Sequence, residues 1–90
     1  PESIGALVGL EKLDLCNNQL TALPESIGAL VGLKELYLRS NKLTALPESI
    51  VALTALRKLD LSFNPLTKPQ SPAVEAWLAA LQASGCDVKF

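Results

Sequence analysis

The sequence predicts an α/β repeat solenoid, with short parallel strands stacked on one side and irregular or 3₁₀ turns on the other. An eleven-residue pattern, Leu-x-x-Leu-x-Leu-x-x-Asn-x-Leu, occurs at residues 10–20, 33–43 and 56–66, with a period of 23 residues. In its centre, as in Leu36-Tyr37-Leu38, apolar residues alternate with the two-residue period of a strand. Repetition at such a period is typical of stacked units in which each repeat covers its neighbour.

The residues between the strand patterns predict one tight turn in each repeat. Residues 1–23 and 24–46 are identical at 17 of 23 positions, and residues 47–69 match 24–46 at 12. Pro24 and Glu25 suit the start of a helical turn, and Ile27 and Leu30 lie three residues apart on one face of it. Because only about six residues are available, we expect a single 3₁₀ or irregular turn with proline at its first position.

Residues 67–90 depart from the period and predict a C-terminal cap after the repeats of residues 1–66, which comprise a partial first repeat and three strand units. Three prolines between residues 65 and 72 are incompatible with a continued strand ladder. We expect a helix over about residues 72–84, with Ser71 as its N-cap and Gly85 as its left-handed end. Its apolar stripe consists of Val74, Trp77, Leu78 and Leu81. Alternation over about residues 86–90 predicts a final strand.

Composition and charge argue against nucleic acid and membranes as partners. The formal net charge is −1, with 8 basic and 9 acidic residues, so the chain has no strong attraction for nucleic acid or an anionic membrane surface. The sequence contains no apolar run of membrane-spanning length and no signal-peptide pattern. Cys16 and Cys86 lie three repeats apart, roughly 14 Å at a strand spacing of ~4.8 Å, which is too far for a disulfide and favours a reducing compartment.

No catalytic or metal-binding constellation stands out, which indicates a protein that is not an enzyme and carries no cofactor or metal. There is no histidine, so a Ser-His or Cys-His nucleophile pair cannot form. Asp14 and Asp60 lie two strands apart, roughly 9–10 Å, which is the separation of an inverting carboxylate pair, but Tyr37 stands between them on a solvent-facing row. Cys16 would be a reactive thiol if Arg39 lowered its pKa; an exposed, unreactive cysteine is the simpler interpretation.

The pattern of residues 10–20, followed by x-x-L-P-x-x-I-x-x-L, resembles that of leucine-rich repeat proteins. The first copy matches at Leu10, Leu13, Leu15, Asn18, Leu20, Leu23, Pro24, Ile27 and Leu30. The L-P-x-x-I-x-x-L form is similar to the 23-residue class of Ras-group, Roco and bacterial effector repeats, and the resemblance covers residues 1–66. It implies a leucine-rich-repeat arc with a short parallel sheet on the concave face and the turns on the convex face. It also assigns Asn18, Asn41 and Asn64 to a ladder that bonds backbone groups of its own and the neighbouring turn.

Facing residues of neighbouring repeats form rows across the predicted sheet, and these rows are the candidate partner-binding surface. The rows are Lys12-Glu35-Lys58, Asp14-Tyr37-Asp60 and Cys16-Arg39-Ser62, with an edge row Asn17-Ser40-Phe63. The first row alternates in sign, which favours lateral ion pairs of ~0.2–1 kcal/mol or simply holds register. Tyr37, Arg39 and Phe63 are stronger candidates, because tyrosine and arginine are enriched in binding hot spots and an exposed phenylalanine adds apolar contact. The convex turns and the open end of the stack remain alternative binding surfaces.

The predicted function is a protein–protein interaction scaffold that binds another protein through the concave face. Two alternatives stay open: the substrate-recognition part of a larger enzyme, such as a Roco GTPase or a bacterial effector ubiquitin ligase, and a consensus-like engineered scaffold. The expected location is the cytoplasm, or a host cell if the chain is a secreted bacterial effector. The sequence begins in mid-repeat at Pro1, so we expect an uncapped N-terminal end that exposes Leu7 and Leu10 and offers a surface for self-association.

Overall fold

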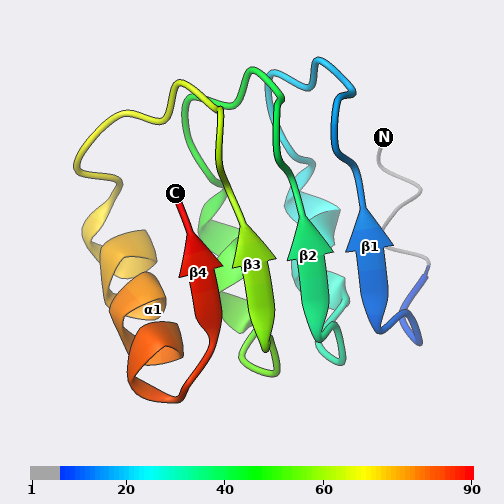
Figure 1. The fold of residues 1–90 in the computed structure, drawn as a ribbon. Helices are drawn as coiled ribbons and strands as arrows, with labels where there is room; N and C mark the ends of the chain where they lie inside the picture. The colour runs from blue at the N-terminus through cyan, green and yellow to red at the C-terminus, as the bar shows by residue number, and fades with distance from the viewer. Residues whose placement is uncertain (1–6) are drawn as a thin grey trace.

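The computed structural model describes residues 7–90, which form one curved stack with a sheet on one side and turns and a helix on the other (Figure 1). The strands are β1 (Lys12–Asp14), β2 (Glu35–Tyr37), β3 (Lys58–Asp60) and β4 (Asp87–Lys89). They form a single sheet in the order β1-β2-β3-β4, and every neighbouring pair is parallel. Two 3₁₀ turns, η2 (Glu25–Ala29) and η3 (Glu48–Ala52), and the helix α1 (Pro72–Ala83) make up the opposite layer. The predicted solenoid is confirmed.

The 3₁₀ turns begin one residue later than the sequence indicated. Pro24 and Pro47 are N-caps in extended conformation, with ψ of 151° and 148°, and the helical residues start at the glutamates that follow. Proline fits this place because its fixed φ suits an extended residue and it has no N–H to leave unpaired. Each turn buries one isoleucine, Ile27 or Ile50, and ends after five residues.

Gly28 lets the two 3₁₀ turns pack directly against each other. A Cβ built at Gly28 would lie 2.6 Å from the backbone oxygen of Ser49, which is closer than any real side chain approaches. The Ser49 hydroxyl donates a hydrogen bond to the carbonyl of Glu25 at 2.7 Å across the same contact. One repeat later, where α1 instead packs against η3, the equivalent residue is Val51. The tight spacing of the convex layer therefore depends on glycine where two 3₁₀ turns meet.

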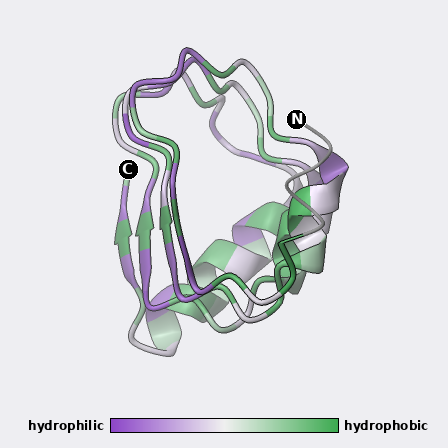
Figure 2. Cartoon of the chain, turned by 90° about the vertical axis from the view of Figure 1, so that its right-hand side faces the viewer, coloured by the Kyte–Doolittle hydropathy of each residue, from purple (hydrophilic) through white to green (hydrophobic). Residues whose placement is uncertain are grey.

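The core is a column of leucine and isoleucine side chains between the two layers, and successive repeats superpose when viewed along the stack (Figure 2). In the second repeat Leu36 and Leu38 are fully buried, whereas Leu13 in the first repeat is only half-buried. At the N-terminal end Leu7 is 50% exposed, as expected. The expectation that Leu10 is exposed is wrong, because its side chain is half-buried and packs against the core.

In the C-terminal segment, α1 lies in the same layer as the 3₁₀ turns and packs against η3. The Ser71 hydroxyl accepts a hydrogen bond from Val74 N–H at 3.3 Å as the N-cap of α1, and Gly85 follows the helix with a φ of 96°. Trp77 is buried, and its indole N–H donates to the carbonyl of Leu53 at 3.1 Å, which joins α1 to the end of η3. Within residues 7–90, α1 and the other helical segments are all too short or too polar to span a bilayer.

Candidate functional site

The strand register sets out two complete rows of side chains on the solvent side of the sheet, called here the concave face. One row is Lys12-Glu35-Lys58-Asp87 and the other is Asp14-Tyr37-Asp60-Lys89. Sequence reasoning predicted three members of each row and missed Asp87 and Lys89, which β4 contributes. The alternation of residues 86–90 was the available signal, but the 23-residue period does not reach these positions and gave no register for them.

Tyr37 occupies the centre of this face and forms its closest polar contact. Its hydroxyl donates a hydrogen bond to the Glu35 carboxylate, which stands two residues away on the same side of β2. This bond, together with burial and the negative charges around it, raises the pKa of Tyr37 to about 12. The same bond, aided by the charges of Lys12 and Lys58, lowers the pKa of Glu35. The Lys12 ammonium lies 5.7 Å from the centroid of the Tyr37 ring.

Phe63 and Arg39 form a second pair at the edge of the concave face. The Arg39 guanidinium lies 4.8 Å from the centroid of the Phe63 ring, within the range of a cation–π contact. Phe63 is 69% exposed, although it is a large apolar residue. Its backbone is left-handed, with a φ of 59°, as are Asn17 and Ser40 at the equivalent positions of the earlier repeats, each at 60°. Asparagine tolerates this conformation better than a bulky residue does, so the phenylalanine stands out in the series.

The two aspartates that flank Tyr37 are both held in the charged form. Hydrogen bonds from the Cys16 thiol and backbone N–H lower the pKa of Asp14. Burial alone would raise the pKa of Asp60, but hydrogen bonds from Ser62 and the charges of Arg39 and Lys89 bring it below the ordinary value. A general acid needs the opposite shift, so this carboxylate pair gives no support to glycosidase-like chemistry.

The surroundings of Cys16 give no support to the alternative of a reactive thiol at this position. Burial and the neighbouring Asp14 raise the pKa of Cys16, and a hydrogen bond with the backbone of Arg39 offsets this increase only in part. A raised pKa leaves less thiolate, which is the nucleophilic form. Cys86 is buried, its pKa is also raised by burial, and both cysteines are free. Residues 7–90 contain no group of three or more acidic or sulfur ligands that is able to hold a metal ion.

A shallow depression of about 130 Å³ lies on the concave face where β2, β3 and β4 meet. It is lined by Tyr37, Lys58, Leu59, Asp60, Asp87 and Lys89. The charged side chains around it alternate in sign, whereas Leu59, between Lys58 and Asp60 on β3, has its side chain buried in the core on the other side of the sheet. The depression is small enough to receive one side chain of a partner rather than a metabolite, since ligand pockets are usually ≈ 300–1,000 Å³.

Beneath this face, Asn41 joins the loops of the first two repeats. Its side-chain oxygen accepts hydrogen bonds from the N–H groups of Asn18 and Leu20, both at 3.0 Å. Its amide group donates to the carbonyls of Leu15 and Leu38, both at 2.9 Å. Asn41 is 6% exposed, so these bonds satisfy polar groups that water barely reaches.

Of the other two asparagines, Asn64 also bonds to the neighbouring repeat, whereas the side chain of Asn18 bonds only within its own turn. Asn64 accepts from Leu43 N–H at 3.1 Å and donates to the carbonyl of Leu38 at 2.9 Å, so it also joins two repeats. Asn18 is exposed, and its amide donates at 3.2 Å to the carbonyl of Cys16 in its own turn. Beyond Asn64, Gln70 continues the loop contacts, since its side-chain oxygen accepts from Leu46 N–H at 3.0 Å.

Comparison with known proteins agrees with this architecture. A family model described as "Leucine rich repeat" matches residues 8–66. The solved structure of a leucine-rich repeat protein from Leptospira interrogans is 38% identical, with a TM-score of 0.84 over 100% of this chain. The present chain spans 22% of the length of that protein. No curated protein matches the sequence. The period, the parallel sheet and these matches together show that the chain belongs to the leucine-rich repeat family.

Proposed function

We propose that this chain is a protein-interaction module that binds a segment of a partner protein on its concave face, around Tyr37, Arg39 and Phe63. The observation that carries the proposal is Phe63. A bulky side chain is held in a left-handed conformation and left 69% exposed, where the other repeats have asparagine and serine. Strained conformations of this kind are concentrated at functional sites. The contact with Arg39 keeps the ring in place on the surface without burying it.

The partner segment we infer carries a lysine or arginine beside an apolar residue. Asp14 and Asp60 flank Tyr37 in the row, and both stay ionised, so the centre of the face is acidic around an aromatic ring. Opposite charge aids encounter and register more than it adds affinity. The apolar contact is therefore expected to come from Tyr37 and from the Phe63 edge.

The test is an unbiased pull-down, followed by affinity measurements of the captured protein with substituted chains. Tyr37→Ala and Arg39→Ala are each expected to weaken binding by more than about 1 kcal/mol, roughly fivefold, because binding energy is concentrated in central aromatic and arginine side chains. Trp77 is the single tryptophan, and its fluorescence checks that each variant remains folded.

The matched controls are Glu25→Ala and Glu48→Ala. Both glutamates are exposed in the first turns of η2 and η3, on the opposite side of the molecule. Neither change is expected to alter the affinity. If the affinity of the partner falls on substitution of the convex glutamates and is unchanged by Tyr37→Ala and Arg39→Ala, the partner binds the convex side and the proposal is contradicted.

A further inference from the structure

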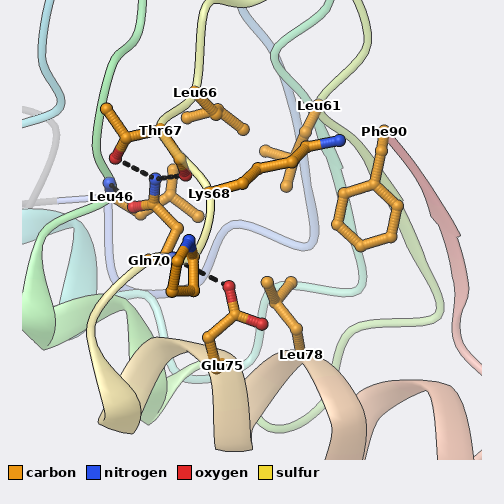
Figure 3. Close-up of a pocket in the computed structure, with 10 residues that line it drawn as sticks. Leu46, Leu61, Leu66, Thr67, Lys68, Gln70, Glu75, Leu78 and Phe90 are labelled. Carbon is orange, nitrogen blue, oxygen red and sulfur yellow. Dashed lines mark hydrogen bonds between the residues drawn. The ribbon is translucent and has the colours of Figure 1, made fainter.

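A cavity of about 520 Å³ lies between the loop after β3 and α1 (Figure 3). Gln70 accepts there from Leu46 N–H at 3.0 Å and donates to the carbonyl of Thr67 at 2.7 Å, and Glu75 accepts from Gln70 N–H at 2.8 Å. These polar groups are therefore used in holding the loop. The depression of about 130 Å³ on the concave face differs from this cavity, because four charged side chains line it.

The depression lies over β3, which has a paired strand on each side. Lys58 and Asp60 come from β3, Asp87 and Lys89 come from β4, and Tyr37 of β2 forms the remaining wall. The register makes the two aspartates diagonal neighbours on adjacent strands, at ~7–8 Å, and the two lysines lie on the opposite diagonal. The strand pairing of one sheet therefore fixes the relative positions of all four charged residues.

Both carboxylates of the depression keep hydrogen-bonding capacity. Ser62 donates to Asp60 from its backbone N–H at 3.0 Å and from its hydroxyl at 2.6 Å, and both bonds end on Oδ1. These bonds hold the carboxylate in place and leave Oδ2 for another donor. Asp87 is exposed, and its side chain forms no hydrogen bond or ion pair within residues 7–90.

The lysines of the depression differ from the aspartates in reach. An aspartate carboxylate is attached directly to Cβ and stays near the strands, whereas a lysine ammonium ends a flexible four-carbon stem. Lys58 and Lys89 are both exposed, so their ammonium groups are free to turn outward to the rim. A long basic side chain that enters the depression therefore reaches carboxylates near the strands, whereas an acidic one meets mobile ammonium groups.

Tyr37 adds a surface that suits a planar cation. Its hydroxyl donates to Glu35, which holds the ring along β2, and the Lys12 ammonium that lies 5.7 Å from the ring centroid comes from β1, on the other side of β2 from the depression. Arginine stacks on aromatic rings, and its five N–H donors form a planar fork. A guanidinium would therefore contact the ring and both carboxylates at once, whereas a lysine ammonium acts as a point charge.

Taking the concave-face function proposed above as given, we propose that the depression receives an arginine side chain of the partner segment. Its guanidinium lies between the carboxylates of Asp60 and Asp87 and against the ring of Tyr37. The basic residue of the partner is thereby narrowed to arginine. Asp87 gives the C-terminal strand β4 a direct part in recognition.

The probes are the peptide acetyl-Ala-Arg-Leu-Ala-amide and its versions with lysine or citrulline in place of arginine, titrated into the isotope-labelled 90-residue chain. For the arginine peptide, saturable NMR shifts are expected at the amides of Asp60, Asp87 and Lys89. The lysine peptide should bind at least threefold more weakly, and the citrulline peptide, which has the same shape without the charge, at least tenfold more weakly. No saturation at millimolar arginine peptide, or equal affinities for arginine and lysine, would overturn the proposal.

Two exposed acidic residues provide a matched pair of protein variants. Asp87→Asn removes a carboxylate of the depression, whereas Glu48→Gln makes the same change of net charge in η3, on the convex side. Neither side chain is buried, so both variants are expected to fold. The Asp87 change should weaken binding of the arginine peptide at least fivefold, and the Glu48 change should leave it within twofold. Equal losses would show a response to net charge alone and would contradict the proposal.

Lys89 distinguishes a basic occupant from an acidic one. Lys89→Gln removes a positive charge from the lining, so the arginine peptide should bind at least twofold more tightly. If the depression binds acidic side chains instead, acetyl-Ala-Glu-Leu-Ala-amide will saturate it and will lose affinity on the same substitution. That result would overturn the proposal.

The partner captured on the concave face separates failure of this proposal from failure of the proposed function. If Tyr37→Ala and Arg39→Ala weaken its binding while Asp87→Asn leaves it unchanged, the partner uses the concave face without an arginine in the depression, and the present proposal alone fails. If all three changes leave the affinity unchanged, the proposed function fails as well.

Discussion

Asn18 and Asn41 occupy the same position in neighbouring repeats, yet their surroundings differ greatly. Asn41 is 6% exposed and makes four hydrogen bonds, three of them to groups of the preceding repeat. Asn18 is exposed and bonds to a carbonyl in its own turn. The two residues are equivalent in the sequence pattern. They differ in the structure, because Asn41 forms hydrogen bonds with the repeat before it, whereas the amide of Asn18 bonds within its own turn.

The leucines show the same contrast. Leu36, Leu38 and Leu43 of the second repeat are 0% exposed. Their counterparts Leu13, Leu15 and Leu20 of the first repeat are all half-buried. A repeat stack is stabilised by nearest-neighbour contacts, so a residue with a repeat on each side contributes more than the same residue at an end. Position in the stack, rather than agreement with the pattern, sets the energetic importance of a repeat residue.

The largest expected effect is that of Asn41→Ala. The substitution leaves the N–H groups of Asn18 and Leu20 and the carbonyl of Leu15 without a partner, and unsatisfied buried groups cost about 1–3 kcal/mol. The free energy of unfolding, measured by urea denaturation with Trp77 fluorescence, should fall by that amount.

Two controls sharpen this prediction. Asn18→Ala removes one bond at an exposed position and should lower the free energy of unfolding by less than about 0.5 kcal/mol. Tyr37→Ala should also be milder than Asn41→Ala, since Tyr37 is on the surface. Equal denaturation midpoints for the three variants would show that the asparagine bonds do not join the repeats.

A smaller effect is expected from Gly28→Ala. The new Cβ would meet the Ser49 backbone oxygen at 2.6 Å, and η2 would have to move away from η3. Overpacking costs ~1–3 kcal/mol, and the lower conformational entropy of the unfolded alanine chain offsets ~0.4–1 kcal/mol of it. We expect a net loss of about 1 kcal/mol in the same urea experiment.

Gly32→Ala is the matched control for Gly28, because a Cβ at Gly32 would have nothing within 4 Å. It should leave stability unchanged or raise it slightly. The pair compares a glycine inside the stack with one at its surface, as Asn41 and Asn18 do for asparagine. A Gly28 variant as stable as the Gly32 variant would mean that the convex layer is loosely packed.

Features that repeat every 23 residues could be predicted from the sequence, and those that depart from the period could not. Local patterns were sufficient to predict the strands, the 3₁₀ turns, the row that contains Tyr37, and the C-terminal helix with Ser71 before it and Gly85 after it. The hydrogen bond that Gln70 accepts from Leu46 N–H could not be predicted, because it depends on how the loop after β3 folds back. The cavity of about 520 Å³ between the loop after β3 and α1 also could not be predicted, because most of its lining residues come after Leu66, where the 23-residue pattern ends.

The candidate site shows the same division. The period placed Arg39 and Phe63 near one another on the concave face, but it did not indicate the left-handed backbone of Phe63. The bond from Tyr37 to Glu35 joins residues two apart on one strand face, so strand alternation was a sufficient signal for their proximity. Whether two such side chains bond to each other or to solvent depends on side-chain rotamers, which the pattern does not specify.

The smallest expected effect concerns Tyr37, the single tyrosine, whose ionisation is therefore followed directly by near-ultraviolet absorbance. Its pKa of about 12 lies above the ordinary value of 10.0, chiefly because the phenol donates a hydrogen bond to Glu35. The folded state favours the protonated phenol, so the associated stabilisation is present below pH 10 and lost as pH rises toward 12. Glu35→Gln should move the midpoint down toward 10.0, because it removes the carboxylate acceptor and its charge. Replacing Glu25 on the convex side in the same way should leave the midpoint unchanged. A parent midpoint near 10.0 would mean that the central strand does not hold this bond in solution.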